Sequence, residues 1–222
     1  MEHVVRLDEQ DVEECKTIAS MPGRDKRDQW VENAYRKGFV DYNTFLGCVG
    51  EKAFSKTFFD GSIDKSISSL GDGGKDFSCY SFDIDVKCQA TEAKWAIEKL
   101  GVYGGFYTIA VDKYGREKEL KYDMVFFSVV NGLFYNNKWI RNYDIIKNTL
   151  NNNHQNILKI DIELVGYIWK KDILKNKNER IAPTLRRSKG SDKNYYMKRE
   201  ELKFPSSISH FNEILEWGVV FE

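Results

Sequence analysis

Histidine and cysteine are scarce in this sequence, and neither occurs in a ligand pattern. The three histidines and four cysteines are His3, His154, His210, Cys15, Cys48, Cys79 and Cys88. No histidine stands at a recognisable ligand spacing, and no two cysteines stand at a two-residue spacing. A histidine-based triad or zinc site, a zinc knuckle and a redox cysteine pair are therefore all poorly supported.

Long apolar runs are also missing. No stretch approaches the about 20 apolar residues that a membrane-spanning helix needs. The first fifteen residues are acidic and hold no apolar run behind a basic start, so we expect no signal peptide and a cytoplasmic, reducing location. A GxxxxGK[ST] phosphate loop is absent too, which argues against an NTPase.

The sequence does contain enough apolar material for one sizeable domain, with 41% hydrophobic and 31% charged residues. Its net charge of zero hides an uneven distribution. Residues 170–199 hold eleven Lys or Arg and three Asp or Glu, a local balance of +8 on a body of −8. Such a basic segment is typical of a nucleic-acid contact, and the alternative is a solvated loop that keeps the protein soluble.

The hydrophobic pattern predicts both helices and strands. Helices are expected over residues 8–20 and 28–59, the second with a break near Gly38, and from Ser207 or Ser209 onward. Gly47 and Gly50 each cost a helix about 1 kcal/mol relative to alanine, so we expect them where the helix lies close against a sheet.

Alternating or apolar runs predict the strands. They cover residues 78–89, 104–111, 122–130 and 162–169, and the last two are apolar enough to suit central strands. Residues 148–156 are expected to be a polar connection. Residues 170–200 are expected to be a long basic loop around one or two short elements.

Asp76, Asp85 and Lys87 form the most promising chemical group. Asp85 and Lys87 stand two apart in a strand whose polar positions alternate with apolar ones, so they share one side. Asp76 follows a glycine-rich turn and joins them if the chain folds back. Two carboxylates can hold Mg²⁺, which activates water for attack on a phosphodiester, and a lysine stabilises the charge that develops.

Spacing alone is weak support, because an acid two residues before a lysine occurs five times. The pairs are Glu14/Lys16, Asp85/Lys87, Glu92/Lys94, Glu119/Lys121 and Glu201/Lys203. Most such pairs are solvated surface charges. The Asp85/Lys87 pair differs because it sits in an apolar strand behind a turn that carries another acid. The plainer alternative is a polar strand face open to water.

The segments GGKDF and DIDVKCQ together resemble the signature of the PD-(D/E)xK, or restriction-endonuclease-like, nucleases. Upstream, GCVGEKAFSK is similar to the helix that these enzymes place before their core sheet. Downstream, YDMVFFSVV, IELVGYIW and NYYMKREEL are similar to later parts of the core, so the resemblance covers about residues 40–205. One departure is that Lys75 stands where the name-giving proline would be.

The resemblance implies an α/β fold with a central mixed β-sheet flanked by helices. We expect a single nuclease domain over residues 1–222. Its parts would be an N-terminal helical region (1–40), a catalytic core (41–170), and a basic loop with a C-terminal helix (171–222).

Carried over residue by residue, the resemblance implies a phosphodiesterase that depends on Mg²⁺ or Mn²⁺ and cuts DNA, as an endonuclease. Asp76, Asp85 and the carbonyl of Val86 would bind the metal. Lys87 would position or activate the water. Glu51 would bind a second metal or a metal-bound water, although a glutamate in a helix is usually just a solvated helix former.

Nucleic-acid contacts are expected from Gln89, on the strand face of Lys87, and from the basic segment. The basic residues that could contact phosphates are Arg180, Arg186, Arg187, Lys189, Lys193, Lys198 and Arg199. Tyr195 or Tyr196 could stack on a base, whereas the aromatic residues of YDMVFFSVV are expected in the core. A homodimer would suit cleavage of both DNA strands.

Two other functions stay open. One is a nuclease-like module that binds nucleic acid or protein without cutting, although the intact set of Asp76, Asp85 and Lys87 argues against it. The other is a hydrolase of RNA or of a nucleotide, which would use the same metal chemistry.

Overall fold

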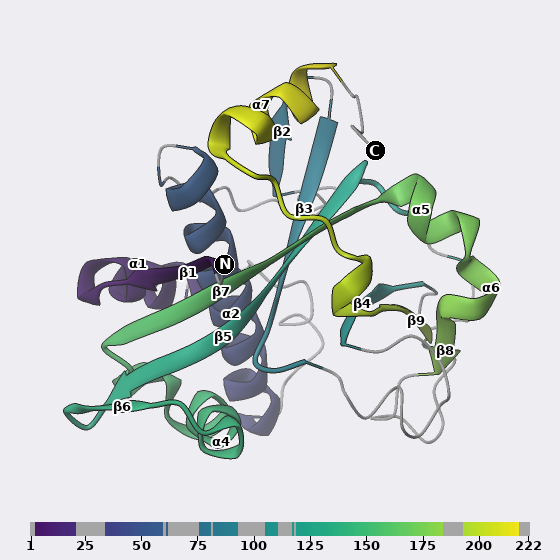
Figure 1. Ribbon diagram of the computed structural model, residues 1–222. Helices are drawn as coiled ribbons and strands as arrows, with labels where there is room; N and C mark the ends of the chain where they lie inside the picture. The colour runs from purple at the N-terminus through teal and green to yellow at the C-terminus, as the bar shows by residue number, and fades with distance from the viewer. Residues whose placement is uncertain are drawn as a thin grey trace. The chain divides into compact units, whose positions relative to one another are not determined.

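The strands of the computed structural model form a mixed, curled central sheet flanked by helices, which confirms the expected α/β fold (Figure 1). The structure describes residues 3–20, 34–59, 61, 76–80, 82–92, 105–110, 117, 119–183 and 193–217.

The central sheet has the strand order β1-β7-β5-β3-β2, and β6 pairs with β5. Its strands are β1 (His3–Leu7), β2 (Phe77–Cys79), β3 (Phe82–Gln89), β5 (Met124–Tyr135), β6 (Lys138–Ile140) and β7 (Lys159–Trp169). The two most apolar runs, now β5 and β7, have neighbours on both sides, as expected of central strands. The aromatic residues Phe126 and Phe127 of β5 are both 0% exposed, which confirms them as core.

A second, smaller sheet has the order β4-β9-β8. Its antiparallel strands are β4 (Phe106–Ile109), β8 (Ile181–Pro183) and β9 (Lys193–Met197). Residues 170–200 therefore hold more regular structure than the basic loop that we expected. The reason is burial, because the last four residues of β9 are all covered by the rest of the protein.

Helices occupy much of the remaining described chain. They are α1 (Glu9–Ser20), α2 (Ala34–Phe58), α4 (Tyr143–Asn153), α5 (Lys170–Lys175), α6 (Lys177–Arg180) and α7 (Ile208–Trp217), with short 3-10 turns η2 (His154–Asn156) and η3 (Arg199–Glu201). Asp8 starts α1 as expected, since its Oδ1 accepts the N–H of Asp11 at 3.1 Å. Ser207 likewise starts α7, and its Oγ accepts the N–H of His210 at 3.0 Å.

Two predictions about helices are wrong. No break occurs at Gly38, because α2 runs without interruption through that position. The polar connection expected over residues 148–156 is instead the end of α4 followed by η2. Asn142 caps α4 by accepting the N–H groups of residues 144 and 145, and Ile146 and Leu150 are buried one turn apart. A few apolar anchors thus outweigh an asparagine-rich surface.

The chain divides into two compact units. Unit 1 comprises Met1–Asp76, Val86–Thr91 and Ser128–Leu164, and unit 2 comprises Phe77–Asp85, Glu92–Phe127 and Val165–Glu222. Strands β3, β5 and β7 each contribute residues to both units. In unit 1, α2 packs against α1 and β1. In unit 2, the rings of Phe126, Tyr167 and Phe211 form an aromatic cluster with centroids 6.3–6.4 Å apart.

Candidate active site

A tight hairpin brings Asp76 to strand β3. Strands β2 and β3 pair antiparallel, with Phe77 opposite Ile84, so the single strand expected over residues 78–89 folds back on itself. The N–H of Val86 donates a hydrogen bond of 2.6 Å to Asp76 Oδ2. This folding-back is the condition under which we expected Asp76 to join Asp85 and Lys87, and it is met.

Asp85 is withdrawn from water in the middle of β3. Its exposed fraction is 2%, compared with 0% for Ile84 and 3% for Val86. Both faces of β3 are therefore covered at this point, since Asp85 lies on the opposite side of the strand from Ile84 and Val86. The alternative of a water-exposed polar face is excluded for this carboxylate. Removing a carboxylate from water costs several kcal/mol unless hydrogen bonds or a cation compensate.

Helix α2 approaches β3 within unit 1 through a glycine. A Cβ atom at Gly50 would lie 2.5 Å from Cys88 Cβ and 3.1 Å from Ser128 Oγ, closer than real side chains come. The expected close helix–sheet approach is therefore confirmed at Gly50 but is wrong at Gly47, where the described residues put only Glu51 of α2 itself within 4 Å of an added Cβ. Two residues at this contact stand next to expected site residues, since Glu51 follows Gly50 and Lys87 precedes Cys88.

Glu51 and Lys87 are both partly buried. The Glu51 side chain folds back along α2, with Oε1 3.7 Å from the position that a Cβ would take on Gly47. Burial, the neighbouring Cys48 thiol and the negative charge of Glu51 together raise the pKa of the Cys15 thiol. The Glu51 side chain is thus less hydrated than a fully solvated helix position.

The expected catalytic and metal-binding residues Glu51, Asp76, Val86 and Lys87 belong to unit 1, as does Gln89. Asp85 is the last residue of a segment of unit 2. The peptide bond between Asp85 and Val86 ties that carboxylate to the others through the chain itself.

The described residues contain no group of three or more His, Cys, Asp and Glu side chains arranged to hold a metal ion. The carboxylates of Glu51, Asp76 and Asp85 are therefore not gathered into one ligand cluster. The site offers the Asp85 carboxylate and the Val86 carbonyl on β3, the Asp76 carboxylate that accepts the Val86 N–H, and Lys87. Gln89 is 7% exposed and donates from Nε2 to the Thr91 carbonyl at 3.3 Å, so a contact with substrate would have to replace that bond.

The basic segment is less open than we expected. Arg180 is 3% exposed, and its Nη2 lies 2.6 Å from Glu201 Oε1, so a phosphate would have to compete with that ion pair. Arg199 is half-exposed but pairs with Glu92. Lys193 is exposed at the start of β9.

The other expected nucleic-acid residues divide into untested and wrong predictions. Arg186, Arg187 and Lys189 lie outside the described residues. Tyr195 and Tyr196 are 1% and 0% exposed, so the expected base stacking is wrong for both. Their rings are buried because β9 is the middle strand of the smaller sheet.

Sequence reasoning missed a cavity in unit 2 lined by Phe82, Asp123, Trp169, Lys170, Lys171 and Leu174. These residues come from three separate stretches of chain. The adjacent lysines at 170 and 171 were visible as part of the basic segment, but nothing in the sequence joined them to Asp123.

No protein-family model, no curated protein and no solved structure matches this chain. The resemblance to PD-(D/E)xK nucleases therefore stays a prediction, and the site geometry has to support any function by itself.

Among the described residues, no helix is both long and apolar enough to cross a membrane.

Proposed function

We propose that this chain is a metal-dependent nuclease that hydrolyses phosphodiester bonds in DNA, with Asp76, Asp85 and Lys87 at the reaction centre. The observation that supports this most strongly is the burial of Asp85, which is 2% exposed between two apolar residues of β3. A buried charge in a strand lowers stability, so its presence suggests that its charge is used.

Magnesium or manganese fits the donors on β3. The carboxylates of Asp76 and Asp85 and the carbonyl of Val86 would hold the ion, and all three supply oxygen. Mg²⁺ is usually bound by one or two carboxylates while water and substrate phosphate complete its shell, so the lack of a third carboxylate is no obstacle. When bound, the ion would activate a water and neutralise charge on the phosphodiester.

The hydrogen bond from the Val86 N–H fixes the Asp76 carboxylate against β3 at 2.6 Å. Such fixed orientation lowers the cost of reorganising the site during the reaction. The Lys87 ammonium would hold the attacking water and stabilise charge on a non-bridging phosphate oxygen. Glu51, on the helix that meets β3 at Gly50, would accept a hydrogen bond from that water.

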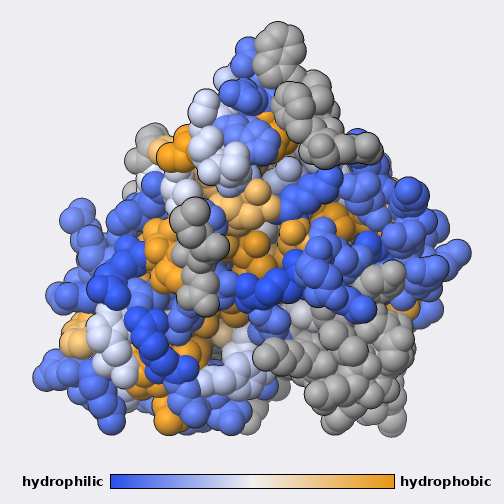
Figure 2. All heavy atoms as spheres, viewed as in Figure 1, coloured by the Kyte–Doolittle hydropathy of each residue, from blue (hydrophilic) through white to orange (hydrophobic). Residues whose placement is uncertain are grey.

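DNA is the proposed substrate because of the basic segment. Residues 170–199 carry a balance of +8, and Lys193 is exposed. The hydrophilic colour on the visible side of α5 and α6 agrees with a charged surface there (Figure 2). Lysine and arginine contacts to phosphates give affinity without sequence preference, so we propose an endonuclease whose specificity is set elsewhere.

The test is cleavage of a plasmid and of labelled oligonucleotides with Mg²⁺, Mn²⁺ or EDTA. Wild type is compared with Asp85→Asn and Lys87→Met. The matched controls are Glu119→Gln and Lys121→Met, which change an exposed pair at the same spacing. We expect metal-dependent cutting that each site substitution lowers by about 100-fold or more, while both controls cut like wild type.

Each other outcome has a definite meaning. Metal-dependent cutting that survives both site substitutions would refute the assignment of Asp85 and Lys87. DNA binding without cutting under any metal would favour the binding module. Cutting of an RNA oligonucleotide in preference to its DNA counterpart would move the substrate class to RNA.

A further inference from the structure

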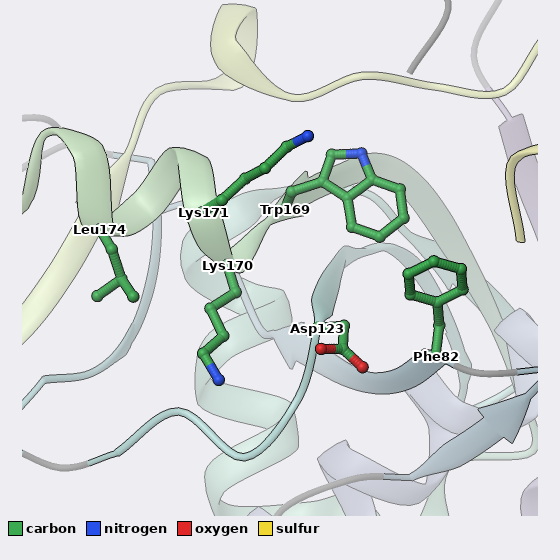
Figure 3. A pocket seen from close by; sticks show the side chains of 6 residues that line it. All are labelled: Phe82, Asp123, Trp169, Lys170, Lys171 and Leu174. Carbon is green, nitrogen blue, oxygen red and sulfur yellow. The ribbon is translucent and has the colours of Figure 1, made fainter. Parts of the chain in front are cut away.

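Unit 2 contains a cavity of about 350 Å³ where the start of β3, the residue before β5 and the junction of β7 with α5 meet (Figure 3). Its lining residues are Phe82, Asp123, Trp169, Lys170, Lys171 and Leu174. The volume lies at the lower end of the range of about 300–1,000 Å³ for small-molecule sites. One nucleotide is a ligand of suitable size.

Two aromatic rings and a leucine form the apolar part of the lining. The Phe82 and Trp169 rings meet edge to face, with centroids 5.3 Å apart and planes at 64°. A second edge contact, to Tyr167 at 6.1 Å, holds the indole from another side. The indole is therefore fixed in orientation before any ligand arrives, and it offers a surface on which a planar ring can pack.

Cationic and donor groups lie beside this aromatic wall. Figure 3 shows the Lys171 side chain pointing toward the indole nitrogen of Trp169. The Lys170 side chain points the opposite way, to the side of the cavity where Asp123 lies. In the described part of the chain, neither lysine makes an ion pair or a side-chain hydrogen bond. Trp169 is 5% exposed, and its buried Nε1 has no hydrogen-bond partner among the described residues. A ligand with anionic oxygens would pair with the lysines, which offer it cationic contacts on two sides of the cavity.

Asp123 adds one fixed acceptor to a cationic cavity. Its Oδ2 accepts the Asp83 N–H at 2.9 Å, its own N–H donates to the Asp83 carbonyl at 2.8 Å, and its carbonyl accepts the Lys170 N–H at 2.8 Å. A carboxylate here repels a simple inorganic anion. It suits a ligand that also presents an N–H or O–H donor, such as a nucleobase amino group or a sugar hydroxyl.

We propose that this cavity is a nucleotide-binding site. The base packs against Trp169, the phosphate lies beside Lys171, Lys170 adds positive charge on the other side of the cavity, and a base N–H or sugar O–H donates to Asp123. A ligand with an aromatic plane, an anion and a donor matches the lining, whereas inorganic phosphate matches only the lysines. The same chemistry is offered by a free nucleotide and by an unpaired nucleotide of a strand.

This site is separate from the carboxylates of β3. Phe82 stands three residues before Asp85, and an odd separation in a strand points side chains to opposite faces. The nucleotide site therefore does not depend on the proposed cleavage reaction and can be tested without it.

The experiment is isothermal titration calorimetry in EDTA, with tryptophan fluorescence as a second readout. The titrants are dAMP, deoxyadenosine and orthophosphate. We expect saturable binding of dAMP, with deoxyadenosine and orthophosphate each at least about tenfold weaker, because each lacks one recognised part. An oligonucleotide with an unpaired adenosine end and its blunt duplex identify the source. Tighter binding of the unpaired end than of dAMP points to a strand, the reverse to a free nucleotide, and both support the site.

Variants locate the binding. The double substitution Lys170→Gln with Lys171→Gln should weaken dAMP binding by about tenfold or more. Lys175→Gln on the same helix, an exposed lysine that does not line this cavity, should bind like wild type. Trp169→Phe should weaken binding and abolish the fluorescence change. Absence of saturable dAMP binding, equal affinity for orthophosphate, or equal loss in the Lys175→Gln control would overturn the proposal.

Discussion

Replacing Gly50 with alanine tests the contact between α2 and β3 on which the position of Glu51 depends. An added Cβ would lie 2.5 Å from Cys88 Cβ and 3.5 Å from Cys88 Cα. Both atoms belong to the rigid part of β3, so the helix or the strand has to move. Gly47, one turn earlier in α2, is the matched control, because among the described residues a Cβ there would meet only Glu51 Oε1, at an ordinary 3.7 Å.

Both substitutions gain the helix propensity of alanine, which raises the free energy of unfolding. Only the substitution at Gly50 also brings overpacking, which lowers it. Alanine is better than glycine inside a helix by about 0.8–1 kcal/mol, and this gain applies at both positions. Overpacking costs about 1–3 kcal/mol, and it applies only at Gly50. Gly47→Ala should therefore raise the free energy of unfolding by about 1 kcal/mol. Gly50→Ala should be less stable than Gly47→Ala by about 1–3 kcal/mol, since the shared gain cancels.

Urea unfolding followed by circular dichroism measures this difference, and thermal unfolding should separate the variants by about 2–4 °C for each kcal/mol. If Gly50→Ala proves as stable as Gly47→Ala, the close approach of α2 to β3 is not real. Under the proposed function, Gly50→Ala should also slow cleavage, because a displaced α2 carries Glu51 away from Lys87.

Two further predictions concern charged groups of unit 1. Lys52 is 8% exposed, and its Nζ lies 2.7 Å from Glu14 Oε2, so Lys52→Met should lower the free energy of unfolding by about 1.5–3 kcal/mol in a urea titration. Burial alone would raise the pKa of Asp161, but hydrogen bonds and charges of two arginines hold it below its ordinary value of 3.8. A carboxyl group whose pKa is lower in the folded than in the unfolded protein stabilises the fold at pH values above its unfolded pKa. This stabilisation is lost as the pH falls through the folded pKa, because the group is then protonated in both states. Wild type should therefore lose stability from pH 6 to pH 3 more steeply than Asp161→Asn.

Each of these has its own control and contrary outcome. Lys16 is equally buried but pairs with an exposed glutamate at 3.2 Å, so Lys16→Met should cost less than Lys52→Met. Equal losses would show that the partner's burial does not matter. For Asp161, parallel pH profiles of wild type and Asp161→Asn would show that this carboxyl does not contribute to acid unfolding.

Local signals in the sequence were enough for much of the framework. The apolar runs of β5 and β7 implied central strands, and Gly50 implied a close helix–sheet approach. The cap at Ser207 marked a helix start, because an oxygen side chain before a run of periodic apolar residues satisfies free N–H groups. The same reasoning gave a wrong prediction for the asparagine-rich end of α4, which was expected to be a loop. This segment is helical because buried apolar residues, and not its polar surface, stabilise the helix.

Strand β3 shows what the sequence could not predict about the candidate site. Alternation by itself determined that Asp85 and Lys87 share a strand side, because the side-chain period of a strand is two. Whether that side is covered depends on the layers packed around it, and only the tertiary structure showed that Asp85 is 2% exposed. The burial of Tyr195 and the cavity around Trp169 were likewise decided by contacts between segments that are distant in the sequence. The alternation of apolar and polar residues in a strand determines to which side each side chain points. Whether that side is buried depends on residues elsewhere in the chain that pack against it.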